Sequence, residues 1–365
     1  MKYIEEYRNP LIIKNLVGEI HKAAKKVPYT VNFMEVCGTH TMAIGRFGIR
    51  QLLPTNIKLL SGPGCPVCVT PDEYIDKAIA LSQMKDVIIT TFGDMVKVPG
   101  SYSSLEKEQA KGKNIQIVYS PLEAFDIAEI HPSRKVIFLG IGFETTAPAV
   151  ALTIKKAYAI GLKNFTVLSG HKLIPPAMET LIEDDKDVKI DGFICPGHVS
   201  AIIGSRPYEN IATKYRVPCV IAGFEPSDIL EAVLLLTKRI LENKTGVENQ
   251  YKRVVKREGN IRARKIMEEV FDIVDSEWRG IGTIKKSGLA IKERYREFNA
   301  DKRHPLKIKV NKKRHRCICG DILKGKKIPV DCKLFGKVCR PESPVGPCMV
   351  SSEGSCAAYY RYEKW

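Results

Sequence analysis

The eleven cysteines of this sequence are the residues whose number and spacing could support chemistry. In a reducing compartment, thiols persist mainly as metal ligands, catalytic groups or buried small hydrophobic residues. Six cysteines gather in the C-terminal tail, and they are Cys317, Cys319, Cys332, Cys339, Cys348 and Cys356. The other five are Cys37, Cys65, Cys68, Cys195 and Cys219. We therefore look for the function of the protein among its thiols.

The tail has enough cysteines to hold an iron-sulfur cluster. One choice of four, with the spacing C-x12-C-x6-C-x16-C, is Cys319, Cys332, Cys339 and Cys356. Four thiolates are what a 4Fe-4S cube requires, and loops rich in Gly and Pro can wrap it from separated positions. Structural zinc usually takes short C-x2-C knuckles, which this tail lacks. We expect a 4Fe-4S cluster, with the choice of four among six cysteines left open.

Two further motifs, "CGTH" (37–40) and "GPGCPVC" (62–68), each follow a predicted strand and precede a predicted helix. A helix N-terminus lowers the pKa of a nearby thiol, so these positions predict reactive or metal-ligating thiolates. Cys65 and Cys68 have the spacing of a thioredoxin-type dithiol. His40 could orient Cys37, donate a proton, or simply form a hydrogen bond at the start of the helix.

Three residues outside these motifs stand at the ends of predicted strands. His198 in "CPGHVS" (195–200) could face the same cleft as the cysteines, and so could Cys195. Glu144 is either an acid in the cleft or a charge at the start of a helix. Cys219 differs from the other thiols because it lies within an apolar strand, where a buried hydrophobic role is expected.

Elements that could position these residues alternate along the middle of the chain. Short β-branched runs and longer amphipathic runs follow one another from about 55 to 243, which is typical of parallel strands joined by crossover helices. The pattern predicts one set of strands at 57–62, 86–92 and 115–120, and a second at 135–143, 164–170, 192–197 and 217–224. The predicted fold is α/β, with two tandem small lobes whose parallel sheets face a cleft.

The remaining segments flank these lobes. Before them we expect a helix at about 4–25 and a strand at 29–36, and after them a helix at 225–243 with more helix to about 275. The N-terminal segment is expected to pack with the tail in a helical, loop-rich iron-sulfur domain. The predicted units are 1–54, 55–131, 132–224 and 225–365.

Composition and charge narrow the class of protein. Hydrophobic residues make up 44% and charged residues 27% of the chain, as in soluble globular proteins. No run approaches the roughly 18 apolar residues of a membrane span, and the N-terminus "MKYIEEYRNP" is unlike a secretory signal, so we expect a cytoplasmic protein. The net charge is +17. Between residues 251 and 316, 21 Lys and Arg face 9 Asp and Glu, which favours an acidic protein partner near Lys312, Lys313 and Arg314 over nucleic acid.

Several motifs together resemble one family. They are "MEVCGTHT" (34–41), "GPGCPVCVTP" (62–71), "GFETTAPA" (142–149), "PGHVSAIIG" (196–204), and "DCKLFGKVC" and "CMVSSEGSCAAYY" in the tail. In this order they resemble HypD, the hydrogenase-formation family, from about residue 30 to the end. The resemblance implies a scaffold for the iron that carries cyanide and carbon monoxide in nickel-iron hydrogenases. It also implies a HypC-type chaperone and a HypE-type cyanide donor as partners, and a chain that is monomeric on its own.

The resemblance also implies roles for individual cysteines. Cys37 would bind the iron together with a cysteine of the chaperone, and Cys65 and Cys68 would be redox-active or help to hold it. The ligands of the 4Fe-4S cluster would be Cys319, Cys332, Cys339 and Cys356. Cys317 and Cys348 would then form a second dithiol, and electrons would pass from the tail to the cleft.

Two other classes of protein remain as alternatives. A stand-alone thiol-disulfide oxidoreductase with an iron-sulfur electron input would turn over generic disulfides and bind no diatomic ligands. An iron-sulfur protein that processes nucleic acid would bind DNA in a salt-dependent way, but only the net charge favours it.

Overall fold

The structure is a computed structural model, and it describes residues 4–183, 187–306 and 317–363. Lys312, Lys313 and Arg314, where an acidic partner was expected, lie outside the described residues. Among the described residues, no helix combines the length and the apolar character needed to cross a bilayer.

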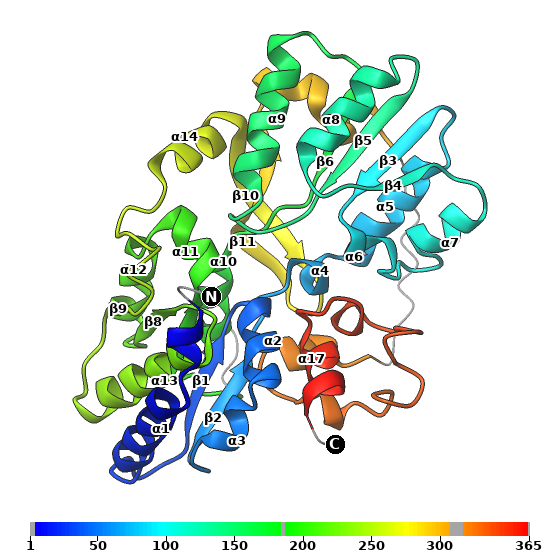
Figure 1. Cartoon of the computed structure of the whole chain (residues 1–365). Coiled ribbons are helices and arrows are strands. Elements are labelled where there is room, and N and C mark those ends of the chain that lie inside the picture. Colours follow the sequence, from blue (N-terminus) through cyan, green and yellow to red (C-terminus); the bar gives the residue numbers. More distant parts are fainter. Residues whose placement is uncertain (1–3, 184–186, 307–316, 364–365) are drawn as a thin grey trace.

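Two parallel sheets form the body of the molecule (Figure 1). The first has the order β2-β1-β7-β8-β9, with β1 at Val31–Glu35, β2 at Ile57–Ser61, β7 at Gly192–Pro196, β8 at Cys219–Ala222 and β9 at Val247–Asn249. The second has the order β4-β3-β5-β6, with β3 at Val87–Thr91, β4 at Ile115–Ile117, β5 at Lys135–Gly140 and β6 at Phe165–Ser169. The α/β class and the parallel sheets are therefore as predicted.

The predicted grouping of strands into sheets is wrong. The strand at 57–62 was grouped with the next two strands, but β2 pairs with β1 in the first sheet. The chain builds β1 and β2, crosses to the second sheet for β3 to β6, and returns for β7 to β9. Local apolar runs predict a strand but do not specify its sheet, because the pairing of Phe33 with Gly192 joins residues far apart in sequence.

Helices cover both sheets. Around the first sheet they are α1 (Pro10–Ala24), α2 (Gly38–Arg46), α3 (Ile49–Leu52), α4 (Pro66–Val69), α11 (Gly197–Ile203), α12 (Arg206–Lys214) and α13 (Pro226–Leu241). Around the second sheet and in the crossings between the two they are α5 (Asp72–Ser82), α6 (Gly93–Val96), α7 (Leu105–Ala110), α8 (Pro121–Ile130), α9 (Ala147–Ala159) and α10 (Ile174–Glu183). Ser120 caps α8, since its side chain accepts a hydrogen bond from the backbone N–H of Leu122.

An antiparallel hairpin lies between the two sheets (Figure 1). It consists of β10 (Phe271–Trp278) and β11 (Gly282–Ile291), and it follows α14 (Ile261–Val270). Helix was expected to continue to about 275, so the start of β10 corrects that expectation. Trp278 anchors the hairpin because its indole is buried, stacks on Phe143 and donates a hydrogen bond to Ser287.

The C-terminal tail is built from loops and short helices that lie beside α2 and α4 (Figure 1, orange and red). Its helices are α16 (Cys319–Leu323) and α17 (Ser355–Tyr362), with 3-10 turns at Pro329–Asp331 and Pro347–Met349, whereas the short α15 (Ala300–Arg303) packs on β6 of the second sheet. The tail packs on the N-terminal segment through α17 and α2, and Arg50 pairs with Glu363 across this contact at 2.8 Å. Chain segments at the two ends of the sequence therefore meet next to the first sheet.

Candidate functional site

The first sheet contains a point where the order of its strands reverses. From β1 the chain goes to β2 on one side, whereas β7, β8 and β9 follow on the other side. In open parallel sheets, ligands bind outside the carboxyl ends of the strands at such a point. Cys37 follows β1, Cys65 follows β2 and His198 follows β7. Three residues that the sequence singled out thus lie along one edge of one sheet.

The loops that carry Cys37 and Cys65 are in direct backbone contact. The N–H of Gly38 donates a hydrogen bond to the carbonyl of Gly64 at 2.8 Å. A Cβ atom on Gly64 would lie 2.0 Å from the backbone nitrogen of Cys37, which no side chain can do. Glycine at position 64 is therefore what allows the two cysteine loops to cross so closely.

Burial dominates the protonation of Cys37. The residue is the N-cap of α2, and the backbone N–H groups of Thr39 and His40 act to lower the pKa of its thiol. Only 7% of Cys37 is exposed, however, and this burial raises the pKa of the thiol to about 12. The sequence predicted that the helix start would favour the thiolate, and burial outweighs that effect.

His40 is buried and is held in place by a hydrogen bond to the protein backbone. It is fully buried, its Nε2 lies 2.8 Å from the carbonyl oxygen of Gly223, and burial lowers its pKa to about 4. A neutral ring that donates from Nε2 has a lone pair on Nδ1, and among the described residues Nδ1 has no partner. His40 and the exposed His198 both pack on Phe224, with ring centroids 4.9 and 4.0 Å from it.

Two carboxylates belong to this site although the sequence analysis did not select them. Glu353 comes from the tail and accepts a hydrogen bond from the hydroxyl of Thr39 at 2.6 Å. Glu35 accepts hydrogen bonds from Thr41 and from the backbone N–H of Cys37, and burial raises its pKa to about 8. Glu353 lies three residues before Cys356 in a quoted motif, which was the available signal for it.

A chain of neighbouring sulfur atoms leads from this site into the tail. Cys65 contacts Cys68, since the backbone N–H of Cys68 lies 3.3 Å from the Cys65 sulfur. The thiol of Cys68 is within hydrogen-bonding contact of Cys348, which in turn contacts Cys319. Cys319 also contacts Cys317. The hydrogen bonds that Cys319 and Cys68 donate to Cys348 lower the pKa of the Cys348 thiol.

Five cysteines of the tail line one small cavity. They are Cys317, Cys332, Cys339, Cys348 and Cys356, and its remaining lining is Ile322, Leu334, Phe335, Gly346 and Met349. The sulfur of Cys317 packs on Gly346, where an added Cβ would come within 2.6 Å of it. Cys319 does not line this cavity, although the sequence spacing selected it as a cluster ligand. Cys319 instead faces a separate cavity that it shares with Cys317 and Arg279.

The lining of this cavity fits an iron-sulfur cluster. Every polar side chain on it is a cysteine, and soft thiolates are the ligands that iron-sulfur clusters and zinc prefer. Within the described parts of the chain, no three His, Cys, Asp or Glu side chains converge on a point where a single ion could bind. A cube binds each thiolate through a different iron atom, so its ligands stand further apart than those of one ion.

The other two cysteines and Glu144 lie elsewhere. Cys219 is fully buried within β8, as predicted, and contacts Cys195 on the neighbouring β7, so Cys195 does not face the cleft. Glu144 is also buried, and burial raises its pKa to about 7. It accepts a hydrogen bond from the backbone N–H of Ile174 and lines a different cavity, between α10, α12 and the hairpin.

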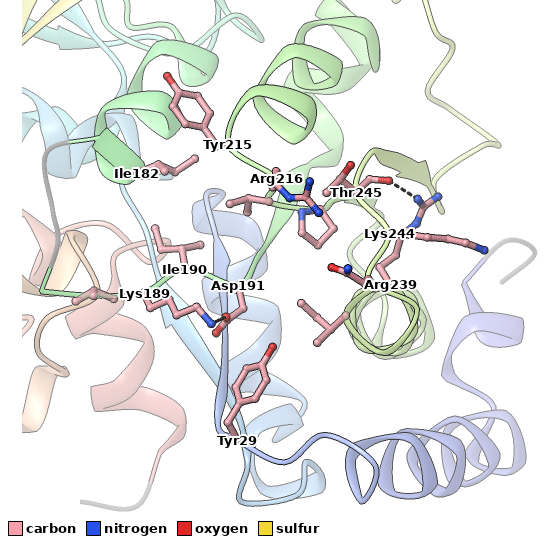
Figure 2. Close-up of a pocket in the computed structure, with 15 residues that line it drawn as sticks. Tyr29, Ile182, Lys189, Ile190, Asp191, Tyr215, Arg216, Arg239, Lys244 and Thr245 are labelled. Carbon is pink, nitrogen blue, oxygen red and sulfur yellow. Dashed lines mark hydrogen bonds and ion pairs between the residues drawn. The ribbon is translucent and has the colours of Figure 1, made fainter.

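A further pocket lies at the amino ends of the strands of the first sheet (Figure 2). Tyr29, Asp191 and Arg216 precede strands β1, β7 and β8 and line this pocket together with Arg239 and Lys244. Its lining contains no cysteine and none of the predicted site residues. Cys37 and Cys65 lie at the other, carboxyl ends of the strands of this sheet.

Comparison with known proteins identifies a family that matches nearly the whole chain. A family model described as HypD, "Hydrogenase formation hypA family", matches residues 11–363. The hydrogenase maturation factor HypD2 of Bradyrhizobium diazoefficiens is 46% identical over 373 residues, which cover 100% of this chain and 98% of that protein. The maturation factor HypD of Cupriavidus necator is 45% identical over 372 residues, which cover 100% of this chain and 98% of that protein.

An archaeal protein is similar to the same extent. The putative hydrogenase expression/formation protein of Methanocaldococcus jannaschii is 44% identical over 353 residues, covering 97% of this chain and 98% of that protein. The matches thus extend over the sheets, the cysteine loops and the tail alike. The chain belongs to the HypD family of hydrogenase maturation factors.

Proposed function

We propose that this chain is the scaffold on which iron receives cyanide and carbon monoxide before delivery to a nickel-iron hydrogenase. The observation that carries the proposal is the place of Cys37 at the strand reversal of the first sheet, between the loops of Cys65 and His198. Its partners would be a HypC-type chaperone, which supplies a second cysteine to the iron, and a HypE-type donor of cyanide.

The iron fragment is the cargo of this site, and a thiolate suits it. Iron with strong-field diatomic ligands is low-spin and electron-rich, so it favours soft sulfur over carboxylate oxygen. Burial keeps the Cys37 thiol protonated, with its pKa near 12, so metal binding must displace that proton. The carboxylate of Glu353, which lies close enough to act on the Cys37 thiol, is the group that would accept it, because burial keeps Glu35 protonated and makes His40 a weak base.

The lining of the tail cavity supports a revised choice of cluster ligands. The residues that would hold a 4Fe-4S cube are Cys317, Cys332, Cys339 and Cys356. When bound there, the cube would supply one electron at a time. Cys319 and Cys348 would then form the second dithiol, because they contact each other and Cys348 also contacts Cys68. In this arrangement the sulfur contacts lead from the cavity through Cys319, Cys348 and Cys68 to Cys65.

Infrared spectroscopy of the protein purified anaerobically with its partners tests this function. We expect bands in the cyanide and carbonyl regions from the wild type, and their loss from Cys37→Ala. Cys219→Ala is the matched control, because it removes a buried thiol that lies within β8 and away from the site. Purified wild type that carries iron but shows no such bands would contradict the proposal.

A further inference from the structure

One loop of the tail exposes several cations that have no carboxylate partner. Lys327, Lys333, Lys337 and Arg340 are all exposed, and none of them pairs with an acid among the described residues. Their neighbour Lys326 differs, because it pairs with Asp187. The acids between 327 and 342 are Asp331 and Glu342, so this stretch has a net charge of +2. We call residues 327–340 the cationic loop.

The cationic loop also exposes apolar side chains. Ile328 is 44% exposed, Val330 is 43% exposed and Val338 is 62% exposed. Single exposed apolar residues are ordinary, but here three occur within one short loop whose other exposed residues are mostly cations. Apolar side chains with a charged rim are characteristic of surfaces that bind another protein.

The inner side of the same loop forms a wall of the cysteine-lined cavity. Cys332, Leu334, Phe335 and Cys339 all line that cavity. Cys332 and Cys339 are 8% and 6% exposed, so their sulfur atoms lie just beneath the surface that carries the cations. A protein bound to the cationic loop would therefore be separated from the cavity by the thickness of this loop alone.

We propose that the cationic loop is the docking surface for a small acidic protein that carries single electrons. This inference rests on the proposed function, since it assumes that the cavity holds a one-electron centre. Each encounter would oxidise the carrier by one electron and reduce the chain by one electron. Two such encounters, with two protons from water, would convert a Cys319–Cys348 disulfide into two thiols. No bond forms between the carrier and the chain.

Charge and geometry both select this partner. Opposite charges steer two proteins into encounter and orient them before contact, while the apolar residues contribute to the short-lived complex. Electron transfer becomes much slower as the distance between donor and acceptor centres increases. A carrier docked on the cationic loop would therefore transfer its electron faster than one docked further from the cavity. The Cys65 end of the sulfur chain is buried and occupied by the cargo site, which leaves the tail as the entry.

Binding of an acidic ferredoxin tests the proposal. The variant Lys333→Glu/Lys337→Glu reverses two charges of the loop, and Lys25→Glu/Lys26→Glu is the matched control at the end of α1. We would measure the affinity of oxidised ferredoxin for each anaerobic protein at several salt concentrations. At low ionic strength the loop variant should lose about tenfold or more in affinity while the control keeps the wild-type value, and high salt should remove the difference.

A second measurement separates docking from the condition of the cluster. Reduced ferredoxin should bleach the visible absorbance of the loop variant more slowly than that of the wild type, whereas dithionite should bleach both equally. Equal affinity of both charge reversals at every salt concentration would overturn the proposal. Tighter binding of duplex DNA than of ferredoxin to the loop would also overturn it. Salt-dependent docking in a protein without cyanide and carbonyl bands would instead contradict the proposed function alone.

Discussion

Cys317 and Cys319 have different surroundings although one residue separates them. Cys317 lines the cavity with Cys332, Cys339 and Cys356, whereas Cys319 contacts Cys348 and lies outside that lining. The sequence spacing could not make this distinction, because both choices give four thiols with long intervals. What distinguishes them is the direction in which each side chain leaves a turn, and that depends on α16 and on the contact of Cys317 with Gly346.

The two serine variants of this pair should therefore behave differently. Cys317→Ser should remove most of the visible absorbance and the iron of the cluster, because it replaces a soft ligand. Cys319→Ser should retain both, because it changes only the dithiol. Iron analysis and absorbance of protein purified without oxygen measure this difference. The reverse outcome would restore the set with Cys319 that the spacing first indicated.

Glu353 shows where sequence reasoning about single residues stops. Its motif was visible, but nothing in the tail indicated that this carboxylate reaches Thr39, which lies 314 positions earlier in the chain. By contrast, Cys37, Cys65 and His198 could be selected from their places at the ends of strands. Local pattern identifies residues that follow a strand, whereas it does not identify a partner from a distant loop.

At the scale of elements, the crossing of the two cysteine loops positions the site. The backbone of Gly64 lies against the backbone of Cys37, and the hydrogen bond from Gly38 to Gly64 closes the contact. Main-chain atoms cannot move aside as a flexible side chain can. The distance between the thiol loops is therefore set by glycine and is sensitive to one methyl group.

Gly64→Ala should destabilise the protein by about 3 kcal/mol or more, because its Cβ would overlap the backbone of Cys37. Gly18→Ala is the matched control, since no atom lies within 4 Å of the Cβ it would add in helix α1. That control should stabilise the protein by about 0.5–1 kcal/mol through helix propensity. Denaturant unfolding measures both changes. An unaltered midpoint for Gly64→Ala would show that the loops can separate at little cost.

Most elements could be predicted, but not their assembly. The strands at 57–62, 164–170 and 192–197 correspond to β2, β6 and β7, and the helix at 225–243 corresponds to α13. The hairpin of β10 and β11 was missed because most of the residues along β10 are exposed, so no buried alternation marks the strand. Sheet membership was also missed, since it depends on pairings between distant strands that no local window contains.

At the scale of the whole molecule, Cys348 connects the cysteines of the tail to those beside the first sheet. It contacts Cys319 on one side and Cys68 on the other. Those two cysteines come from the tail and from α4, so the contact at Cys348 is where the sulfur chain passes from one part of the molecule to the other. Electron delivery to the cargo site would depend on this single side chain.

Cys348→Ser should slow the appearance of cyanide and carbonyl bands by at least about tenfold, a difference of about 1.4 kcal/mol in barrier, while the cluster absorbance remains. Infrared spectra taken during loading measure the rate. Neither the wild type nor Cys348→Ser should reduce a generic disulfide substrate at a useful rate, because Cys65 and Cys68 are only 3% and 0% exposed. Rapid turnover of such substrates by the wild type would favour a thiol-disulfide oxidoreductase instead.

The return of the chain to its first sheet has a consequence for synthesis on the ribosome. β1 is a central strand, yet its neighbour β7 begins at Gly192, so one side of β1 has no partner until that part of the chain has emerged. The second sheet, from β3 to β6, is contiguous in sequence and can form earlier. An apolar strand with a free edge is prone to pair wrongly with other chains. Newly made protein should therefore need protection during this interval, before its cysteine loops have met.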